Sequence, residues 1–68
     1  MDYAVIYEKT DTGYSAYVPD LPGCIAAGGS RSEVRRLMRE AIEMHLELMR
    51  DGGDPAPPPT TWAEVVQV

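Results

Sequence analysis

The sequence has little of the chemistry on which enzymes and disulfide-stabilised proteins rely. One cysteine, Cys24, and one histidine, His45, occur among its 68 residues. A single cysteine excludes an intramolecular disulfide and a metal site built from several thiolates, so we expect Cys24 to be reduced and buried. His45 has no second histidine or cysteine near it in the sequence, and we interpret it as a packing residue of a helix. We therefore expect no metal site, no cofactor and no catalytic residue.

Long apolar runs and basic residues are scarce as well. No stretch approaches the ~20 apolar residues that cross a bilayer, and the first residues show no basic segment followed by an apolar one. We therefore expect no membrane association and a cytoplasmic location. Eleven acidic residues outnumber six basic ones, which gives a formal net charge of −5. This charge opposes non-specific binding to nucleic acid and favours a basic protein partner.

Phenylalanine is absent, and the core must be built with four methionines, four tyrosines and one tryptophan among its larger residues. The length allows one domain. A chain this short buries only about 60% of the surface that its unfolded state exposes, so it is marginally stable alone and gains from association.

The first 18 residues predict a β-hairpin. Its strands are Tyr3–Glu8 and Tyr14–Val18, joined by a polar loop that ends in Gly13. If Glu8 faces Tyr14, one face of the hairpin carries Ala4, Ile6, Ala16 and Val18, and the other carries Tyr3, Val5, Tyr7, Ser15 and Tyr17. One helix can cover only one of these apolar faces, so we expect an oligomer interface on the other. Its predicted residues are Tyr3, Val5, Tyr7 and Tyr17. The alternative is that the tyrosines are half-exposed with their hydroxyls in water.

Residues 17–24, Tyr-Val-Pro-Asp-Leu-Pro-Gly-Cys, predict a rigid turn between the second strand and a third, Cys24–Ala27. Pro22 and Gly23 supply the fixed φ and the positive φ that a type II turn requires. Pro19 lacks an N–H and stops the preceding strand. Such a turn either reverses the chain and does nothing more, or also presents its side chains to a partner.

A long amphipathic helix follows. Ser30 and Glu33 form a capping box, and apolar residues then recur every three or four positions over about 21 residues. This stripe consists of Val34, Leu37, Met38, Ala41, His45, Leu48 and Met49. Gly52 is predicted to end the helix in a left-handed conformation. We expect two i,i+4 ion pairs on the polar surface, Arg36–Glu40 and Arg39–Glu43.

Residues 54–59 are rich in proline and predict an extended connector. Residues 62–68 then predict a last strand, with Trp62 either filling the core or anchoring an interface; we favour the core. A right-handed crossover places this strand parallel to the first. The predicted fold is α+β, a two-layer β-β-β-α-β unit in which one helix packs on a four-stranded mixed sheet of order 3-2-1-4.

The pattern Tyr14-x-Ala16-x-Val18-Pro19-Asp20-Leu21-Pro22-Gly23-Cys24-Ile25-Ala26 resembles the signature of the HicB antitoxin family of bacterial toxin–antitoxin systems. The resemblance continues through Gly28-Gly29-Ser30-x-x-Glu33, Glu40-Ala41-Ile42-x-x-His45-Leu46, Asp51-Gly52 and the prolines of residues 55–59. It implies a partial ribonuclease-H-like fold. It also implies that the protein binds a small, basic, mRNA-cleaving toxin of the HicA type and inhibits it by occlusion.

The rigid turn is the surface we expect to bind this partner. The predicted partner-binding residues are Tyr17, Pro19, Asp20, Leu21, Pro22, Gly23 and Cys24. Glu33, Glu40 and Glu47 recur every seven residues, either as a solvated helix face or as an electrostatic docking stripe. Ribonuclease H chemistry needs several carboxylates converging on two metal ions, and Asp2, Glu8 and Asp20 are not placed to converge, so we expect no enzyme.

The expected partners are a second or further copy of the chain, as a dimer or tetramer, and the toxin. Many family members continue into a C-terminal helix-turn-helix or ribbon-helix-helix domain that binds DNA. We interpret residues 1–68 as a single HicB-like domain without such a domain, and expect no DNA binding by this chain alone. The alternative function is an oligomeric protein-interaction module of the same fold without a toxin partner.

Overall fold

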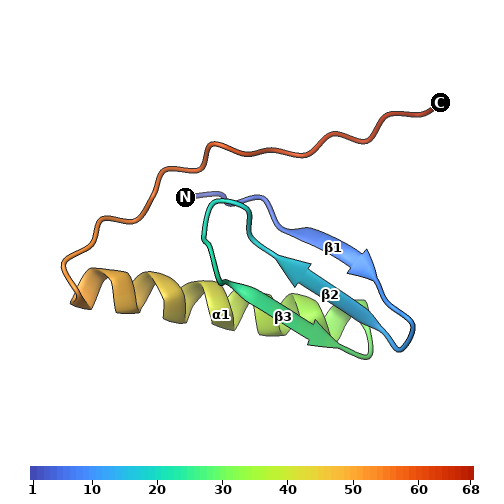
Figure 1. Cartoon of the computed structure of the whole chain (residues 1–68), viewed down its shortest axis with the longest axis horizontal. Coiled ribbons are helices and arrows are strands. Elements are labelled where there is room, and N and C mark those ends of the chain that lie inside the picture. The colour runs from blue at the N-terminus through green and yellow to red at the C-terminus, as the bar shows by residue number, and fades with distance from the viewer.

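Three short strands and one long helix follow one another along the chain in a computed structural model that describes residues 1–68. The elements are β1 (Ile6–Lys9), β2 (Tyr14–Tyr17), β3 (Ile25–Gly28) and α1 (Arg31–Asp51). The strands form one antiparallel sheet in the order β1-β2-β3, and α1 lies across one of its faces (Figure 1). The predicted α+β class is therefore confirmed, with two layers.

Residues 54–68 do not form the predicted fourth strand. They contain no helix or strand, and the sheet has three strands. In Figure 1 the last residues run past β1 without joining it. Trp62 is 83% exposed, so it does not fill the core as predicted. The proline-rich connector that precedes them ends at Thr60 and Thr61, which are hydrogen-bonded to Asp20 of the turn.

The register of the hairpin differs from the prediction by one residue. Ile6 pairs with Tyr17 and Tyr7 with Ala16, because the loop holds four residues and closes with a hydrogen bond of 2.8 Å from the Thr10 N–H to the Gly13 carbonyl. A slip of one residue moves every side chain of a strand to the opposite face. The predicted assignment of residues to the two faces of the hairpin is therefore wrong.

The small core lies between the sheet and α1. Its buried residues are Ala16, Val18, Leu21, Cys24, Val34 and Met38. Three of these come from residues 18–24, where two successive turns point every third side chain inward. The N–H of Leu21 donates to the Val18 carbonyl and the N–H of Cys24 to the Leu21 carbonyl, each at 3.1 Å. Gly23 has a φ of +84°, which confirms the predicted type II turn.

The predicted capping box of α1 is present at its N-terminus. The Ser30 hydroxyl accepts a hydrogen bond of 3.2 Å from the Glu33 N–H, and the Glu33 carboxylate accepts one of 3.0 Å from the Gly29 N–H. These bonds satisfy donors that a helix start leaves unpaired, which confirms the predicted start. No helix in the structure combines the length and apolar character needed to cross a membrane.

At the C-terminus of α1 the left-handed residue is Gly53, with a φ of +80°, whereas Gly52 keeps a right-handed φ of −83°. The Gly53 N–H donates to the Arg50 carbonyl at 3.1 Å, and the Asp54 N–H donates to the Met49 carbonyl at 2.8 Å. This is a Schellman motif with Gly52 as the cap. The predicted end of the helix is confirmed, and the left-handed conformation lies one residue later than predicted.

Candidate protein-interaction site

The predicted partner-binding residues of the turn divide into an inward and an outward group. Leu21 is 1% exposed and Cys24 is 3% exposed, so both are core residues. The expectation that Leu21 projects toward a partner is wrong, because the double turn aims it between the sheet and α1. Pro22 and Gly23 are exposed, and Pro19 is half-buried beside them.

Burial also determines the chemistry of Cys24. Removal from water raises the pKa of its thiol, because the low-dielectric core disfavours the thiolate. The thiolate is the reactive form of cysteine, so Cys24 is an inert packing residue at neutral pH. This is the role expected from the sequence.

Asp20 was predicted to face a partner, but its carboxylate is hydrogen-bonded to residues of the same chain. It accepts hydrogen bonds from the N–H and the hydroxyl of Thr60, both at 2.9 Å. It accepts two more from Thr61, from the N–H at 3.0 Å and from the hydroxyl at 2.8 Å. The Thr61 hydroxyl bond, with the bonds from Thr60 and the Thr61 N–H, lowers the pKa of Asp20 against an opposing effect of desolvation.

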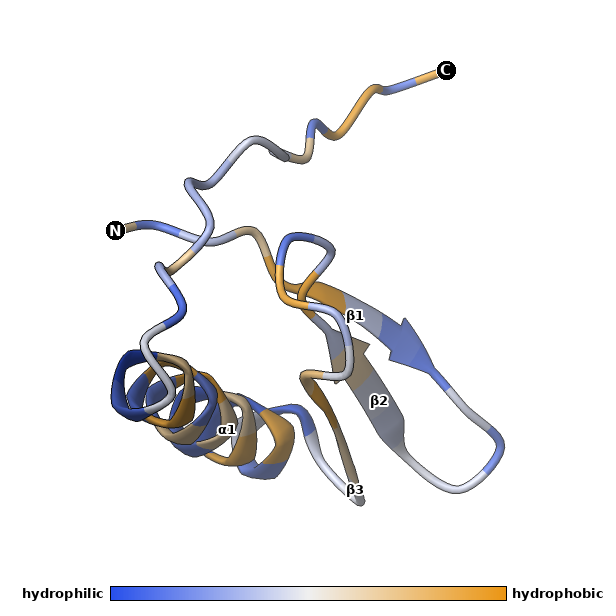
Figure 2. Ribbon diagram, turned by 60° about the vertical axis from the view of Figure 1, so that its left-hand side comes forward, coloured by the Kyte–Doolittle hydropathy of each residue, from blue (hydrophilic) through white to orange (hydrophobic).

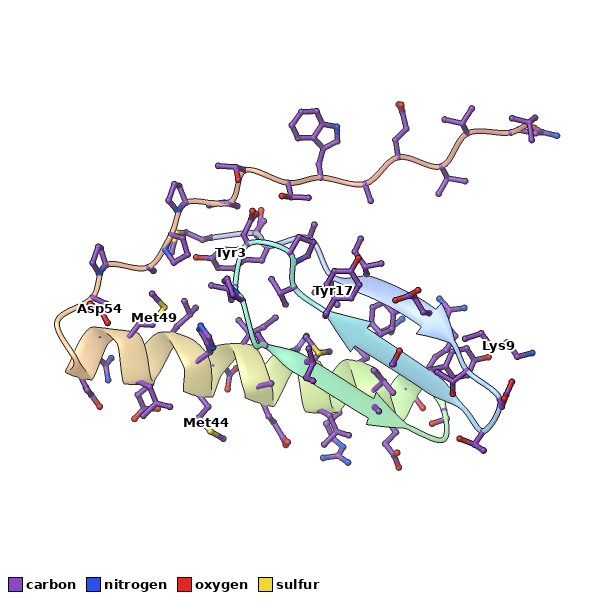
Figure 3. All side chains as sticks on the ribbon, viewed as in Figure 1. Tyr3, Lys9, Tyr17, Met44, Met49 and Asp54 are labelled. Atoms are coloured by element: carbon purple, nitrogen blue, oxygen red, sulfur yellow. The ribbon has the colours of Figure 1, made fainter.

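These contacts fasten the connector across the turn, and sequence reasoning missed them. The Tyr3 hydroxyl adds another contact by donating to the Pro57 carbonyl. In Figure 3 the Tyr3 side chain lies under the connector that leaves α1 near Asp54. The only sequence signal is the Thr60-Thr61 pair directly after the prolines, and its partner lies 40 residues earlier.

The four predicted interface residues do not share one face. Tyr3, Val5 and Tyr7 pack against the core cluster on the side of α1, because of the one-residue difference in register. Tyr17 points to the opposite, open face and is 40% exposed. Whether any of them binds a second copy stays a prediction.

The open face of the sheet is apolar. Ile6, Tyr17 and Ile25 lie opposite one another across the three strands, and Ile25 is 69% exposed. A hollow of about 410 Å³ lies on β2 and β3, lined by Ser15–Tyr17 and Ile25–Ala27. Nothing in the chain covers this face, because α1 packs on the other side of the sheet (Figure 2). A contiguous apolar patch of this kind marks an interaction site.

The charged residues of α1 offer less organised surfaces. The predicted Arg36–Glu40 pair is present at 3.4 Å between exposed side chains, whereas the predicted Arg39–Glu43 pair does not form. Glu33 serves the helix cap and Glu47 is exposed. His45 lines a shallow groove between α1 and β3 with Cys24 and Ile25. No three acidic, histidine or cysteine side chains lie close enough together to hold a metal ion.

A small α+β domain with an open apolar sheet face and a rigid turn beside it has the surface features of a protein-binding domain. The chain belongs to the HicB-like antitoxin family of bacterial toxin–antitoxin systems, whose family model matches residues 3–68. The predicted family is thereby confirmed.

Two solved structures are similar to this chain. One is the HicA3 and HicB3 toxin–antitoxin complex, with a TM-score of 0.72, 33% identity, and coverage of 87% of this chain and 70% of that chain. The other is a crystal structure of antitoxin HicB3, with a TM-score of 0.70, 33% identity, and coverage of 84% of this chain and 42% of that chain.

Similar proteins also occur in a phage, bacteria and archaea. A 14.9 kDa uncharacterised protein of Haemophilus phage HP1 is 40% identical over 57 residues, 84% of this chain and 43% of that protein. A UPF0150 protein of Helicobacter pylori is 46% identical over 41 residues, 60% of this chain and 57% of that protein. A UPF0150 protein of Archaeoglobus fulgidus is 38% identical over 55 residues, 79% of this chain and 80% of that protein. The chain thus spans about half of the first two relatives.

Proposed function

We propose that this protein is an antitoxin that binds a small, basic, mRNA-cleaving toxin of the HicA type and blocks its active site by occlusion. The observation that carries the proposal is the similarity to the HicA3–HicB3 complex, at 33% identity over 87% of the chain. The net charge of −5 supports it, since it attracts a basic partner before contact. The antitoxin acts in the cytoplasm, has no catalytic activity of its own, and does not bind DNA by itself because its charge opposes phosphate contacts.

The docking surface in this proposal is the open sheet face together with the exposed tip of the turn. Tyr17 and Ile25 lie side by side on β2 and β3, and the turn that joins them exposes Pro22 and Gly23. The turn is held by three backbone hydrogen bonds between residues 18, 21 and 24. A surface ordered in advance loses little entropy on binding. Asp20 and Leu21 belong to the support of this surface.

Substitution of Tyr17 and Ile25 by glutamate tests the proposed surface. Tyr17→Glu and Ile25→Glu place a charge where an apolar contact is expected, so each should weaken binding of a HicA-type toxin by about tenfold or more. Isothermal titration calorimetry measures the affinity, and circular dichroism checks that the variants remain folded.

Thr12→Glu is the matched control, because it adds the same charge at an exposed position of the hairpin loop. Its affinity should stay within about twofold of the wild type, as expected for a surface site outside the contact. If Tyr17→Glu and Ile25→Glu are both folded and bind the toxin with wild-type affinity, the toxin binds elsewhere on the protein.

A second candidate function is an oligomeric interaction module without a toxin. The observation that favours it is the apolar character of the open face, which suits a second copy as well as a toxin. In either case we propose self-association as a dimer or tetramer, because a chain of 68 residues with uncovered apolar surface gains stability from it.

A further inference from the structure

The groove between α1 and β3 is apolar and open to solvent. It holds about 210 Å³, and its rim consists of Met44 and Leu48 on α1 and Ile25 on β3. Met44 is 60% exposed, Leu48 65% and Ile25 69%. Met44 and Leu48 lie four residues apart and therefore form one ridge along the helix. An exposed apolar ridge beside an apolar hollow is the kind of surface that contacts another protein.

The groove is free of the chain's own connector and continuous with the open face. In Figure 3 the Met44 side chain points away from the connector, which leaves α1 near Asp54. Ile25 lines both this groove and the hollow of the open face. Because β3 is an end strand of the sheet, the two surfaces meet around its edge. A partner on the open face can therefore reach the groove without displacing any part of the chain.

The charged side chains beside the ridge are acidic. Glu40, Glu47 and Asp51 lie three, four or seven residues from Met44, the spacings that place side chains on the same side of a helix. No lysine or arginine occurs at these spacings from Met44 or Leu48, and residues 21–29 across the groove carry no charge.

These carboxylates differ in how firmly they are neutralised. Arg36 pairs with Glu40 and Arg50 with Asp51, both between exposed side chains, whereas Glu47 takes part in neither ion pair. Exposed pairs of this kind contribute little and are readily exchanged. Glu47 is therefore the carboxylate most available to a partner's cation.

We propose that the basic toxin reaches around the edge of β3 and occupies this groove as well as the open face. One of its apolar side chains lies between Ile25 and the ridge of Met44 and Leu48, and a lysine or arginine beside it pairs with Glu47. The inference rests on the proposed function and extends its docking surface onto α1. A second copy does not fit the groove as well, because it would bring carboxylates of like sign together.

Leu48→Glu tests the apolar contact, because Leu48 lines the groove and not the hollow of the open face. In the full-length protein it should raise the dissociation constant for a HicA-type toxin about tenfold or more, measured by isothermal titration calorimetry. Thr12→Glu, which adds the same charge in the hairpin loop, should stay within about twofold of the wild type. Thermal melting checks that both variants are folded.

Glu47→Lys tests the charged contact, with Asp11→Lys as the control that changes the net charge equally in the exposed hairpin loop. Glu47→Lys should raise the dissociation constant about threefold more than Asp11→Lys does, and this difference should shrink as salt is added, because salt screens exposed charges. Equal effects of the two variants would show a general attraction only and overturn the pairing at Glu47.

The remaining outcomes separate this inference from the proposed function. If a folded Leu48→Glu variant binds the toxin as tightly as the wild type, the groove is not a contact and the open face stands alone. If Leu48→Glu weakens self-association in sedimentation equilibrium but not toxin binding, the groove belongs to a second copy and the inference is overturned. If the wild type does not bind the toxin at all, the proposed function fails and this inference fails with it.

Discussion

At the scale of single residues, two neighbours in the turn have opposite roles. Leu21 is 1% exposed and packs between the sheet and α1, whereas Asp20 points outward and accepts four hydrogen bonds from the connector. The turn thus supports both the core and the C-terminal part of the chain. Substitutions at these two positions should therefore affect different properties.

Leu21→Ala should destabilise the fold by about 2–5 kcal/mol, because it removes a fully buried side chain and leaves a cavity. For a small domain this is a large part of the total free energy of unfolding. Urea denaturation followed by circular dichroism measures the change. Met44→Ala is the control, since Met44 is 60% exposed on α1, and should change the free energy by less than about 0.5 kcal/mol. Equal stability of the two variants would show that Leu21 is not in the core.

Asp20→Asn should loosen the connector without unfolding the domain. The Asn side chain keeps only one acceptor oxygen, and its NH₂ group would face N–H and hydroxyl donors of Thr60 and Thr61, with which it cannot form the same bonds. Faster hydrogen exchange at the Thr60 and Thr61 amides measures the loosening. Asp11→Asn, in the exposed hairpin loop, is the control and should leave both exchange rates unchanged. Protection of both amides as in the wild type would show that the carboxylate does not hold the connector.

The lowered pKa of Asp20 also predicts a pH dependence of the same contact. A carboxyl whose folded-state pKa lies below its unfolded value stabilises the fold above the unfolded value. That stabilisation should be present at neutral pH, begin to fall near the ordinary value of 3.8, and disappear as the pH passes through the lowered folded-state pKa. Amide exchange at Thr60 and Thr61, measured as a function of pH, follows it. Asp20→Asn should show no such loss.

At the scale of elements, local chemistry made α1 and the turn predictable. The hydrogen bond from the Glu33 N–H to the Ser30 hydroxyl joins residues only three positions apart. Gly23 has the positive φ that a type II turn requires at the position after Pro22. Such features depend on neighbours in sequence, so the sequence alone determines them. The boundaries of α1 followed from them.

Contacts between distant residues were less predictable. The hairpin register depends on whether Tyr14 pairs with Lys9, across a loop of four residues, or with Glu8, across a loop of five, and the polar residues of the loop do not settle which. That difference of one residue moved Tyr3, Val5 and Tyr7 to the covered face. The anchoring of Thr60 by Asp20 joins positions 40 residues apart and has no periodic signal. The open face was therefore predicted to exist, but most of its residues were not identified.

At the scale of the whole molecule, the fold leaves more apolar surface uncovered than one helix can bury. The sheet has an open face on β2 and β3, β1 has an open edge with a groove beside it, and the C-terminal valines stand free. The chain that carries these surfaces has a formal net charge of −5. A small domain of this kind is suited to work in complexes with other proteins.

Inhibition of toxin activity is the most direct test of the proposed function. The purified chain is titrated into an RNA-cleavage assay of a HicA-type toxin, at fixed toxin concentration. Occlusion predicts that cleavage falls in proportion to the added chain and stops near equimolar amounts, and that the folded Tyr17→Glu variant requires about tenfold more protein. Undiminished cleavage in the presence of an excess of the folded wild-type chain would contradict the account.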